Sequence, residues 1–312
     1  MENKKKLIIV AGPTASGKTA VSIALAKKIN GEIISADSMQ VYKYMDIGSA
    51  KVTQEQMKGV AHHLVDVLEP HEDFSVHRFQ TMAKVAMTEI YSKNAVPIIA
   101  GGTGFYIQSV VYDIDFSSTD EEEEVRQKVM DYSSVHGEEA LFQWLKDIDP
   151  ESGETIHPNN IKRVQRALEY YLLTGEKMSV HNAREKSKTS PYELTFVVLT
   201  MEREALYERI NRRVDQMIEE GLLDEVKSLL EKGYTKEMTS MQGLGYKELF
   251  DYLNGECSLD EAIYKIKRDT RHFAKRQLTW FRRENNVHWI HVDQYHFDID
   301  AITEAIIKLM EE

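Results

Sequence analysis

The chain has 312 residues, of which 42% are hydrophobic and 29% charged, and its single cysteine is Cys257. This composition excludes extended disorder, a disulfide framework and a Cys-rich zinc module, and it suits a reducing, cytoplasmic compartment. The net charge of -12 argues at face value against a nucleic-acid partner, but residues 115–154 hold thirteen acidic side chains and three basic ones, whereas residues 265–283 hold eight basic ones and one acidic one. Such segregation leaves room for a basic binding surface. The uncharged stretch 94–112 contains a proline and three glycines, so no membrane span is expected.

Short apolar segments alternate with helical patterns in the first third of the chain. Residues 7–11, 33–36 and 96–100 are apolar runs of strand length, and residues 63–67 form a possible further strand. Residues 20–29 show helical spacing between the first two runs. This alternation predicts a parallel sheet with crossover helices.

The pattern changes after residue 114. An acidic run, Asp120–Glu124, opens a stretch of helical periodicity, and residues 194–200 return to a buried-strand pattern. We therefore predict a P-loop NTPase-like α/β core with helices on both faces, residues 1–114 and 193–312, and a mainly helical insertion domain, residues 115–192. Within the insertion, Phe142, Trp144 and Leu145 are expected to form a small core. The loop-like borders of the insertion predict that it moves relative to the core.

After the insertion, two long helices and a last strand are expected. A helix should begin at Glu202 and be interrupted at Gly221, and a second should span residues 260–283. Residues 287–292 read as a strand, and residues 299–311 as a terminal amphipathic helix.

The strongest motif follows the first apolar run. Residues 12–19 read GPTASGKT and match G-x-x-x-x-G-K-[ST] in full, between a strand and a helix. In such loops the backbone N–H groups surround phosphate oxygens, Lys18 adds a positive charge and Thr19 offers a hydroxyl to Mg²⁺. The context disfavours a simple glycine-rich turn. The expected phosphate-binding residues are Gly12, Thr14, Ala15, Ser16, Gly17, Lys18 and Thr19.

Two further polar residues follow strand ends. Asp37 follows the run at 33–36, which places a carboxylate at the carboxyl edge of the sheet beside the P-loop. It is interpreted as a base, a metal ligand together with Thr19, or both; the plainer interpretation is a helix N-cap. Thr103 lies in GGTG after the run at 96–100 and would hold a hydroxyl near a ligand, although a tight turn alone also needs glycine.

Together, the motifs resemble one family, the tRNA dimethylallyltransferases, also called tRNA isopentenyltransferases. The resemblance covers residues 7 to about 290. It rests on GPTASGKT, SADSMQVY (35–42), GGTGFY (101–106), HPNNIKRVQRALE (157–169), RINRRVDQM (209–217), GLGYKE (243–248) and TRHFAKRQLTWFRR (270–283).

This resemblance implies a reaction and its catalytic groups. The family transfers a dimethylallyl group from dimethylallyl diphosphate to the exocyclic amine of the adenine 3′ of the anticodon, and its P-loop holds the diphosphate. Asp37 would take a proton from the amine, Arg213 would stabilise the leaving diphosphate, and Thr103 would lie near the reacting groups. A solvated helix face is the plainer interpretation of Arg213 and its neighbours.

The resemblance also implies contacts with a tRNA anticodon stem-loop. Asp37–Gln40 would meet a flipped adenine, with Gln40 reading one edge, and the exposed face of the insertion helix and the basic C-terminal helix would bind phosphates. A glycine-rich segment with one aromatic residue suits close backbone approach and stacking. The expected tRNA contacts are Asp37, Ser38, Met39, Gln40, Thr103, Arg126, Ile161, Lys162, Arg163, Val164, Gln165, Arg166, Gln242, Gly243, Leu244, Gly245, Tyr246, Lys247, Lys275, Arg276, Gln277 and Arg282.

Other interpretations stay open at this point. The P-loop alone fits a small-molecule kinase, and the chemistry alone fits an adenylate isopentenyltransferase acting on a free nucleotide. An RNA-binding nucleotide switch is a third possibility, although the run at 96–100 ends without an acid. His62 and His63 lack further ligands at metal spacing and are interpreted as structural. A monomer is expected.

Overall fold

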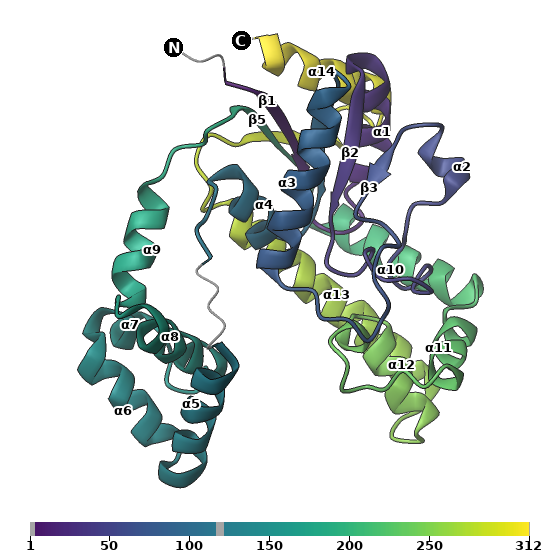
Figure 1. Ribbon diagram of the computed structural model, residues 1–312. Coiled ribbons are helices and arrows are strands. Elements are labelled where there is room, and N and C mark those ends of the chain that lie inside the picture. Colours follow the sequence, from purple (N-terminus) through teal and green to yellow (C-terminus); the bar gives the residue numbers. More distant parts are fainter. Residues whose placement is uncertain (1–3, 117–121, 312) are drawn as a thin grey trace. The chain divides into compact units, whose positions relative to one another are not determined.

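The computed structural model describes residues 4–116 and 122–311, so Asp120 and Glu121 of the predicted acidic run lie outside the described residues. The chain divides into two compact units (Figure 1). The first comprises Met1–Val111 and Pro191–Glu312, and the second comprises Tyr112–Ser190. Each is described here by itself.

The first unit is built on a six-stranded sheet in which every pairing is parallel. Its order is β3-β2-β4-β1-β5-β6, so the P-loop strand β1 is central. The strands are β1 (Lys6–Ala11), β2 (Gly31–Ala36), β3 (His62–His63), β4 (Val96–Gly101), β5 (Glu193–Thr200) and β6 (His288–His291).

Helices cover both faces of this sheet, as the sequence predicted. α1 and α14 pack together on one face, over Ile8, Val10 and Ile98, while α3 and α4 pack on the other (Figure 1). The helices of this unit are α1 (Lys18–Ile29), α2 (Gln54–Met57), α3 (Val76–Ser92), α4 (Gly104–Val111), α10 (Arg203–Glu219), α11 (Leu222–Glu231), α12 (Tyr246–Leu253), α13 (Leu259–Phe281) and α14 (Ile299–Glu311), with a 3₁₀ turn at Ser240–Gln242.

The expected strand at residues 63–67 is wrong beyond its first residue. β3 pairs with β2 only through His62 and His63. Leu64 and Asp66 have φ angles of 63° and 57°, in the left-handed region, which is incompatible with a continued strand.

The second unit is entirely helical among its described residues. Its core consists of Val129, Leu141, Leu145, Val164 and Leu168, with Phe142 and Trp144 packed against it, which confirms the expected small core. The helices are α5 (Glu122–His136), α6 (Glu138–Ile148), α7 (Pro150–Thr155), α8 (Ile161–Thr174) and α9 (Met178–Ser187). None of the helices in the described part of the chain is long and apolar enough to span a membrane.

The ends of β2 and β4 approach each other closely, and this contact positions the candidate site. Ala36 and Gly101 are register partners, and a Cβ at Gly101 would overlap the Ala36 carbonyl oxygen. Glycine is therefore required at 101. The Thr103 N–H donates to the same carbonyl at 3.2 Å, so the segments that carry Asp37 and Thr103 leave the sheet side by side.

Candidate active site

A cavity of about 630 Å³ opens at the carboxyl edge of the sheet in the first unit. It is lined by the P-loop, the ends of β2 and β4, the loop at residues 48–52, the segment 239–247, and residues of α10 and α13. Ligands bind at this edge in open α/β folds because loops from several strands converge there.

The P-loop is held by contacts on its outer side. Arg209 Nε donates to the Ala15 carbonyl at 3.0 Å, and the Thr14 N–H donates to Gln277 Oε1 at 3.0 Å. Ala15 and Gly17 have positive φ angles, and Gly17 precedes the first residue of α1. The Ser16 hydroxyl is buried without a hydrogen-bond partner among the described residues.

Three charged side chains act on one another in the cavity. Lys18 donates to the Pro13 carbonyl at 2.7 Å, and burial together with Arg213 lowers the pKa of Lys18 to about 8, while Asp37 opposes this shift. Burial is also the main cause that lowers the pKa of Arg213, and Asp37 again opposes it. Two cations and one carboxylate leave a net positive site. Anion binding would relieve the repulsion between Lys18 and Arg213.

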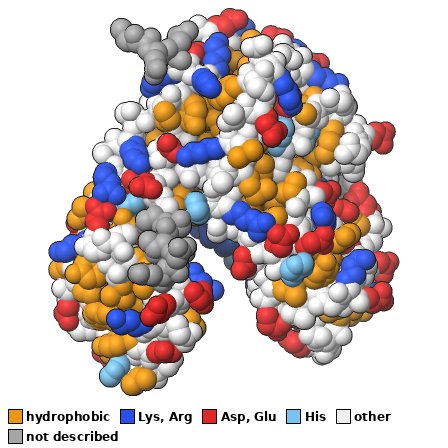
Figure 2. Space-filling view, viewed as in Figure 1, with side chains coloured by type: hydrophobic (Ala, Val, Ile, Leu, Met, Phe, Trp, Pro, Cys, Tyr) orange, Lys and Arg blue, Asp and Glu red, His pale blue; other side chains and the backbone are white. Residues whose placement is uncertain are grey.

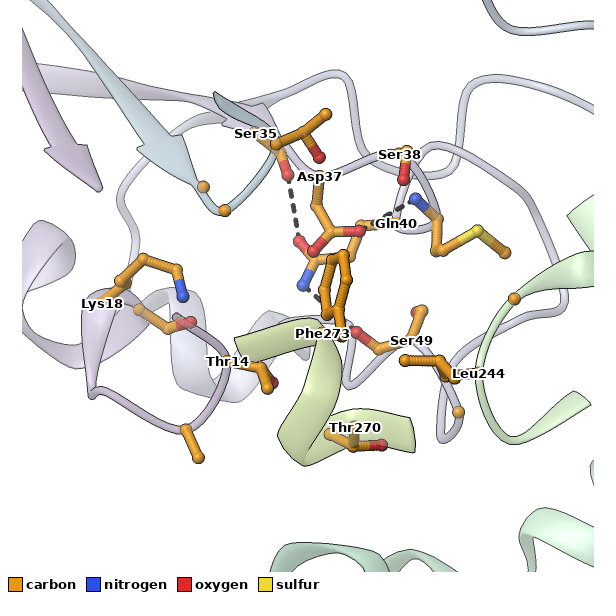
Figure 3. Close-up of a pocket in the computed structure, with 18 of the residues that line it drawn as sticks. Thr14, Lys18, Ser35, Asp37, Ser38, Gln40, Ser49, Leu244, Thr270 and Phe273 are labelled. Carbon is orange, nitrogen blue, oxygen red and sulfur yellow. Dashed lines mark hydrogen bonds between the residues drawn. The ribbon is translucent and has the colours of Figure 1, made fainter. Parts of the chain in front are cut away.

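Asp37 presents its carboxylate to the same cavity (Figure 3). Its Oδ1 accepts the Met39 N–H at 2.9 Å, in an Asx-type turn that fixes the side chain. The expected alternative of a helix N-cap is wrong, because no helix begins within the ten residues after Asp37. A fixed carboxylate at a ligand cavity is suited to accept a proton or to bind a metal ion.

The amide of Gln40 is engaged by protein groups. Its Oε1 accepts from the Ser35 hydroxyl at 3.0 Å, and its Nε2 donates to the carbonyls of Ser49 and Ala50 at 3.4 and 3.2 Å (Figure 3). Gln40 therefore ties the end of β2 to the loop at residues 45–51. To read the edge of a base, the Gln40 amide would have to form hydrogen bonds to that base in addition to these protein groups or in place of them.

That loop is held in turn by Glu225 of α11. Its carboxylate accepts the N–H groups of Asp46, Ile47 and Gly48 at 2.9, 2.7 and 3.1 Å, and the Tyr246 hydroxyl at 2.7 Å. Tyr246 is 0% exposed. The expectation that this ring stacks on a base is wrong, because its ring is core and its hydroxyl is a structural donor.

One side of the cavity is apolar, which sequence reasoning missed. Ile210, Val214 and Met217 of α10 line it together with Ile266 and Phe273 of α13. The spacing of the α10 residues was visible as a buried face, but nothing in the sequence indicated that this face would line a cavity. The cavity is therefore cationic at the P-loop and able to receive a hydrocarbon group beside it.

The structure brings most of the site residues predicted in the first unit to this cavity, but not all of them. Gln277 lines the cavity but is 7% exposed and bonded to protein groups, so the expected phosphate contact by this side chain is wrong. Gly12, Ser16, Tyr246, Lys275 and Arg282 do not line the cavity. The predicted residues that do are Thr14, Ala15, Gly17, Lys18, Thr19, Asp37, Ser38, Met39, Gln40, Thr103, Arg213, Gln242, Gly243, Leu244, Gly245, Lys247, Arg276 and Gln277.

In the second unit, α8 presents a basic face. Lys162, Arg163 and Arg166 are exposed and Gln165 is half-buried, whereas Val164 is 0% exposed. Including Val164 among side-chain contacts was therefore wrong. Ile161 packs against the core of this unit. Arg126 is exposed on α5 and pairs with Glu123 at 3.1 Å. Figure 2 shows acidic and basic side chains interspersed over each unit on the face in view.

The two histidines both contact protein groups, and His62 also lines the cavity. His63 Nε2 lies 2.7 Å from Glu32 Oε2, and His62 Nδ1 lies 2.9 Å from the Val60 carbonyl. Both contacts fasten the edge strand β3 and its approach.

Comparisons with known proteins agree with this geometry. The family model for IPP transferase matches residues 40–284. A tRNA dimethylallyltransferase from Lachnoclostridium phytofermentans is 55% identical over 98% of both chains. A tRNA isopentenylpyrophosphate transferase structure from Bacillus halodurans is 46% identical, with a TM-score of 0.73 over 99% of this chain and 97% of that one. A structure of a eukaryotic dimethylallyltransferase acting on tRNA is 31% identical, with a TM-score of 0.82 over 97% of this chain and 78% of that one.

The match extends over most of the chain in sequence and in fold, and it includes the strand ends and helices that form the cavity. The chain belongs to the IPP transferase family, with the tRNA dimethylallyltransferases as its relatives.

Proposed function

We propose that this protein transfers the dimethylallyl group of dimethylallyl diphosphate to the exocyclic amine of the adenine 3′ of the anticodon in tRNA, releasing diphosphate. The observation that carries the proposal is the composition of one cavity. It presents Lys18 and Arg213 near the P-loop, an apolar wall on α10 and α13, and the fixed carboxylate of Asp37. An allylic diphosphate and a nucleophile need these three surroundings in one place.

The chain's own residues account for both halves of the reaction. The amine of adenine is a weak nucleophile because its lone pair is delocalised into the ring. Asp37 accepts a proton from this amine as the new C–N bond forms and the allylic C–O bond breaks. The electron pair of the broken bond stays on the diphosphate, whose growing charge is stabilised by Lys18, Arg213 and the P-loop N–H groups.

The residues present fit a Mg²⁺ ion. The Thr19 side chain and the Asp37 carboxylate both line the cavity and are the oxygen donors that Mg²⁺ prefers. Thr19, alone or with Asp37, would hold the ion, which would neutralise part of the diphosphate charge when bound.

We further propose that the basic face of α8 and the exposed end of α13 bind tRNA phosphates. Lys162, Arg163 and Arg166 on α8, and Lys275, Arg276 and Arg282 at the end of α13, are all exposed. Contacts of this kind position an RNA without reading its sequence. The protein is proposed to act as a cytoplasmic monomer.

One assay separates this function from its alternatives. Purified protein is given labelled dimethylallyl diphosphate or labelled ATP, with unmodified tRNA, AMP or no acceptor. Label should pass from dimethylallyl diphosphate to tRNA alone. Transfer to AMP would establish an adenylate isopentenyltransferase, and transfer of phosphate from ATP would establish a kinase. Hydrolysis of ATP without transfer would indicate a nucleotide switch.

A further inference from the structure

Gln277 occupies an unusual position for a residue in a strongly basic helical segment. It lies on α13 between Arg276, which is exposed, and Leu278, which is half-buried, yet Gln277 itself is only 7% exposed. A side chain in this position cannot reach an RNA backbone on the surface. Its contacts lie instead with the two loops that carry the phosphate-binding and acceptor sides of the cavity.

Both ends of the Gln277 amide are used. Its Oε1 accepts the Thr14 N–H of the P-loop at 3.0 Å, and its Nε2 donates to the Gly102 carbonyl at 3.0 Å. Gly102 directly precedes Thr103. A carboxamide is suited to this pair because it accepts and donates at once, whereas a carboxylate only accepts and an ammonium only donates.

The backbone at Gly102 packs closely against the amide of Gln277. A Cβ on Gly102 would overlap Gln277 Nε2, and it would lie 3.3 Å from the Gly12 carbonyl oxygen. The P-loop, the Gly102 loop and the amide therefore form one packed contact. A substitution in one of these three parts should therefore displace the others.

We propose that Gln277 is a positioning residue that sets the separation between the diphosphate-binding loop and the loop carrying Thr103. This inference rests on the proposed function. The reacting carbon is held by its diphosphate on one loop, while the acceptor amine lies between Asp37 and Thr103 on the other side. Because the bond forms only when these atoms are correctly aligned, a small displacement between the loops lowers the rate far more than it lowers either affinity.

The first test replaces Gln277 with methionine, which keeps the length and removes both hydrogen bonds. We expect the single-turnover rate of transfer to fall by about 10- to 100-fold, the range for a displacement near 1 Å, with tRNA affinity and its salt dependence unchanged. Thr279→Ala is the matched control, because Thr279 lies on the exposed side of the same helix. It should retain the wild-type rate.

The second test uses the packed contact directly. Gly102→Ala should displace the Gln277 amide and lower the rate by a similar factor. Once Gln277 has been replaced by alanine, which leaves space for the new Cβ, adding Gly102→Ala should cost little more, so the two effects should not multiply. Multiplying effects would show independent roles and overturn the proposal. If the Gln277 variants do not fold, Gly102→Ala is measured alone, and a wild-type rate in that variant would overturn the proposal.

The outcomes distinguish this inference from the proposed function. A wild-type protein that transfers nothing to tRNA would refute the function itself. A wild-type protein that transfers, with a folded Gln277→Met variant at the same rate, would refute positioning by Gln277. Loss of tRNA affinity with a reduced salt slope in Gln277→Met would make it a phosphate contact instead.

Discussion

Replacing Asp37 with asparagine isolates its acid–base role. Asparagine keeps an Oδ1 that can accept the Met39 N–H, so the turn that fixes the side chain at 2.9 Å should persist. What is lost is the ability to take a proton and the negative charge beside Lys18 and Arg213. The second loss has its own consequence, because Asp37 raises the pKa of Lys18, which stands at about 8 in the wild type.

The assay pH therefore has to separate these two effects. Without Asp37 the pKa of Lys18 falls further, and part of the ammonium charge would be lost at pH 8. At about pH 6.5 Lys18 stays largely protonated in the wild type, and the diphosphate itself favours the charged form. The remaining difference in rate then reports proton transfer. A general base contributes about 10²–10⁴ in rate, or roughly 3–5 kcal/mol in the barrier.

The measurement is single-turnover transfer with enzyme and tRNA at saturating concentration, which removes binding from the observed rate. Asp37→Asn should be slower by about 10²–10⁴ with unchanged tRNA affinity. Glu202→Gln removes one exposed carboxylate just before α10 and should leave the rate unchanged. A rate for Asp37→Asn within about threefold of the wild type would show that another group takes the proton.

Three further predictions address binding, pH and stability. The triple variant Lys162→Glu, Arg163→Glu and Arg166→Glu reverses the charges on α8. It should weaken tRNA binding and flatten its salt dependence without changing the affinity for dimethylallyl diphosphate. Wild-type tRNA affinity and salt slope in a filter-binding titration would exclude this face as a tRNA contact. Dimethylallyl diphosphate should bind up to about tenfold more weakly per pH unit above about pH 8, because it binds the protonated form of Lys18; a flat calorimetric profile there would contradict that. Tyr246→Phe should lower the free energy of unfolding by about 1–2 kcal/mol, because the buried hydroxyl bond to Glu225 is lost; unchanged denaturant unfolding would refute this role.

Local signals predicted those parts of the site that one segment builds. The P-loop is contiguous, and its strand–turn–helix context is visible in the sequence. Asp37 and Thr103 could be placed near each other because the carboxyl ends of parallel strands meet at one sheet edge. The structure follows this rule, because Ala36 and Gly101 at the ends of β2 and β4 are register partners.

The errors concern contacts between distant segments. The glycine-rich segment around Tyr246 predicts stacking on a base, but the hydroxyl of Tyr246 donates to Glu225 on another helix and its ring is buried. Gln277 was read from its basic neighbours as a phosphate ligand, but its partners are 263 and 175 residues away. A single sequence carries no sign of such pairings. The only hint against these two predictions is the apolar periodicity of the helices that carry Tyr246 and Gln277, which indicates weakly that one face of each helix is buried.

The basic segment at residues 265–283 shows how the structure refines a charge argument. Several cations in its first part already have side-chain partners: Lys267 lies 2.5 Å from Asp215, Arg268 pairs with Asp269 at 2.7 Å, and Arg271 donates to Asn211 at 2.6 Å. The contacts of Lys267 and Arg271 join α13 to α10, and Lys267 and Arg268 each already face a carboxylate.

The final turns of α13 differ in this respect. Lys275 and Arg282 are exposed, and within residues 4–116 and 122–311 neither forms a salt bridge. Arg276 lines the cavity, and its guanidinium lies 5.8 Å from the centre of the Phe273 ring. A phosphate bound by Arg276 would lie beside the cavity that holds Asp37, whereas Lys275 and Arg282 do not line that cavity. We therefore expect RNA phosphates to bind the last third of the segment, where Lys275, Arg276 and Arg282 are exposed while Gln277 is turned inward to the P-loop and the Gly102 loop.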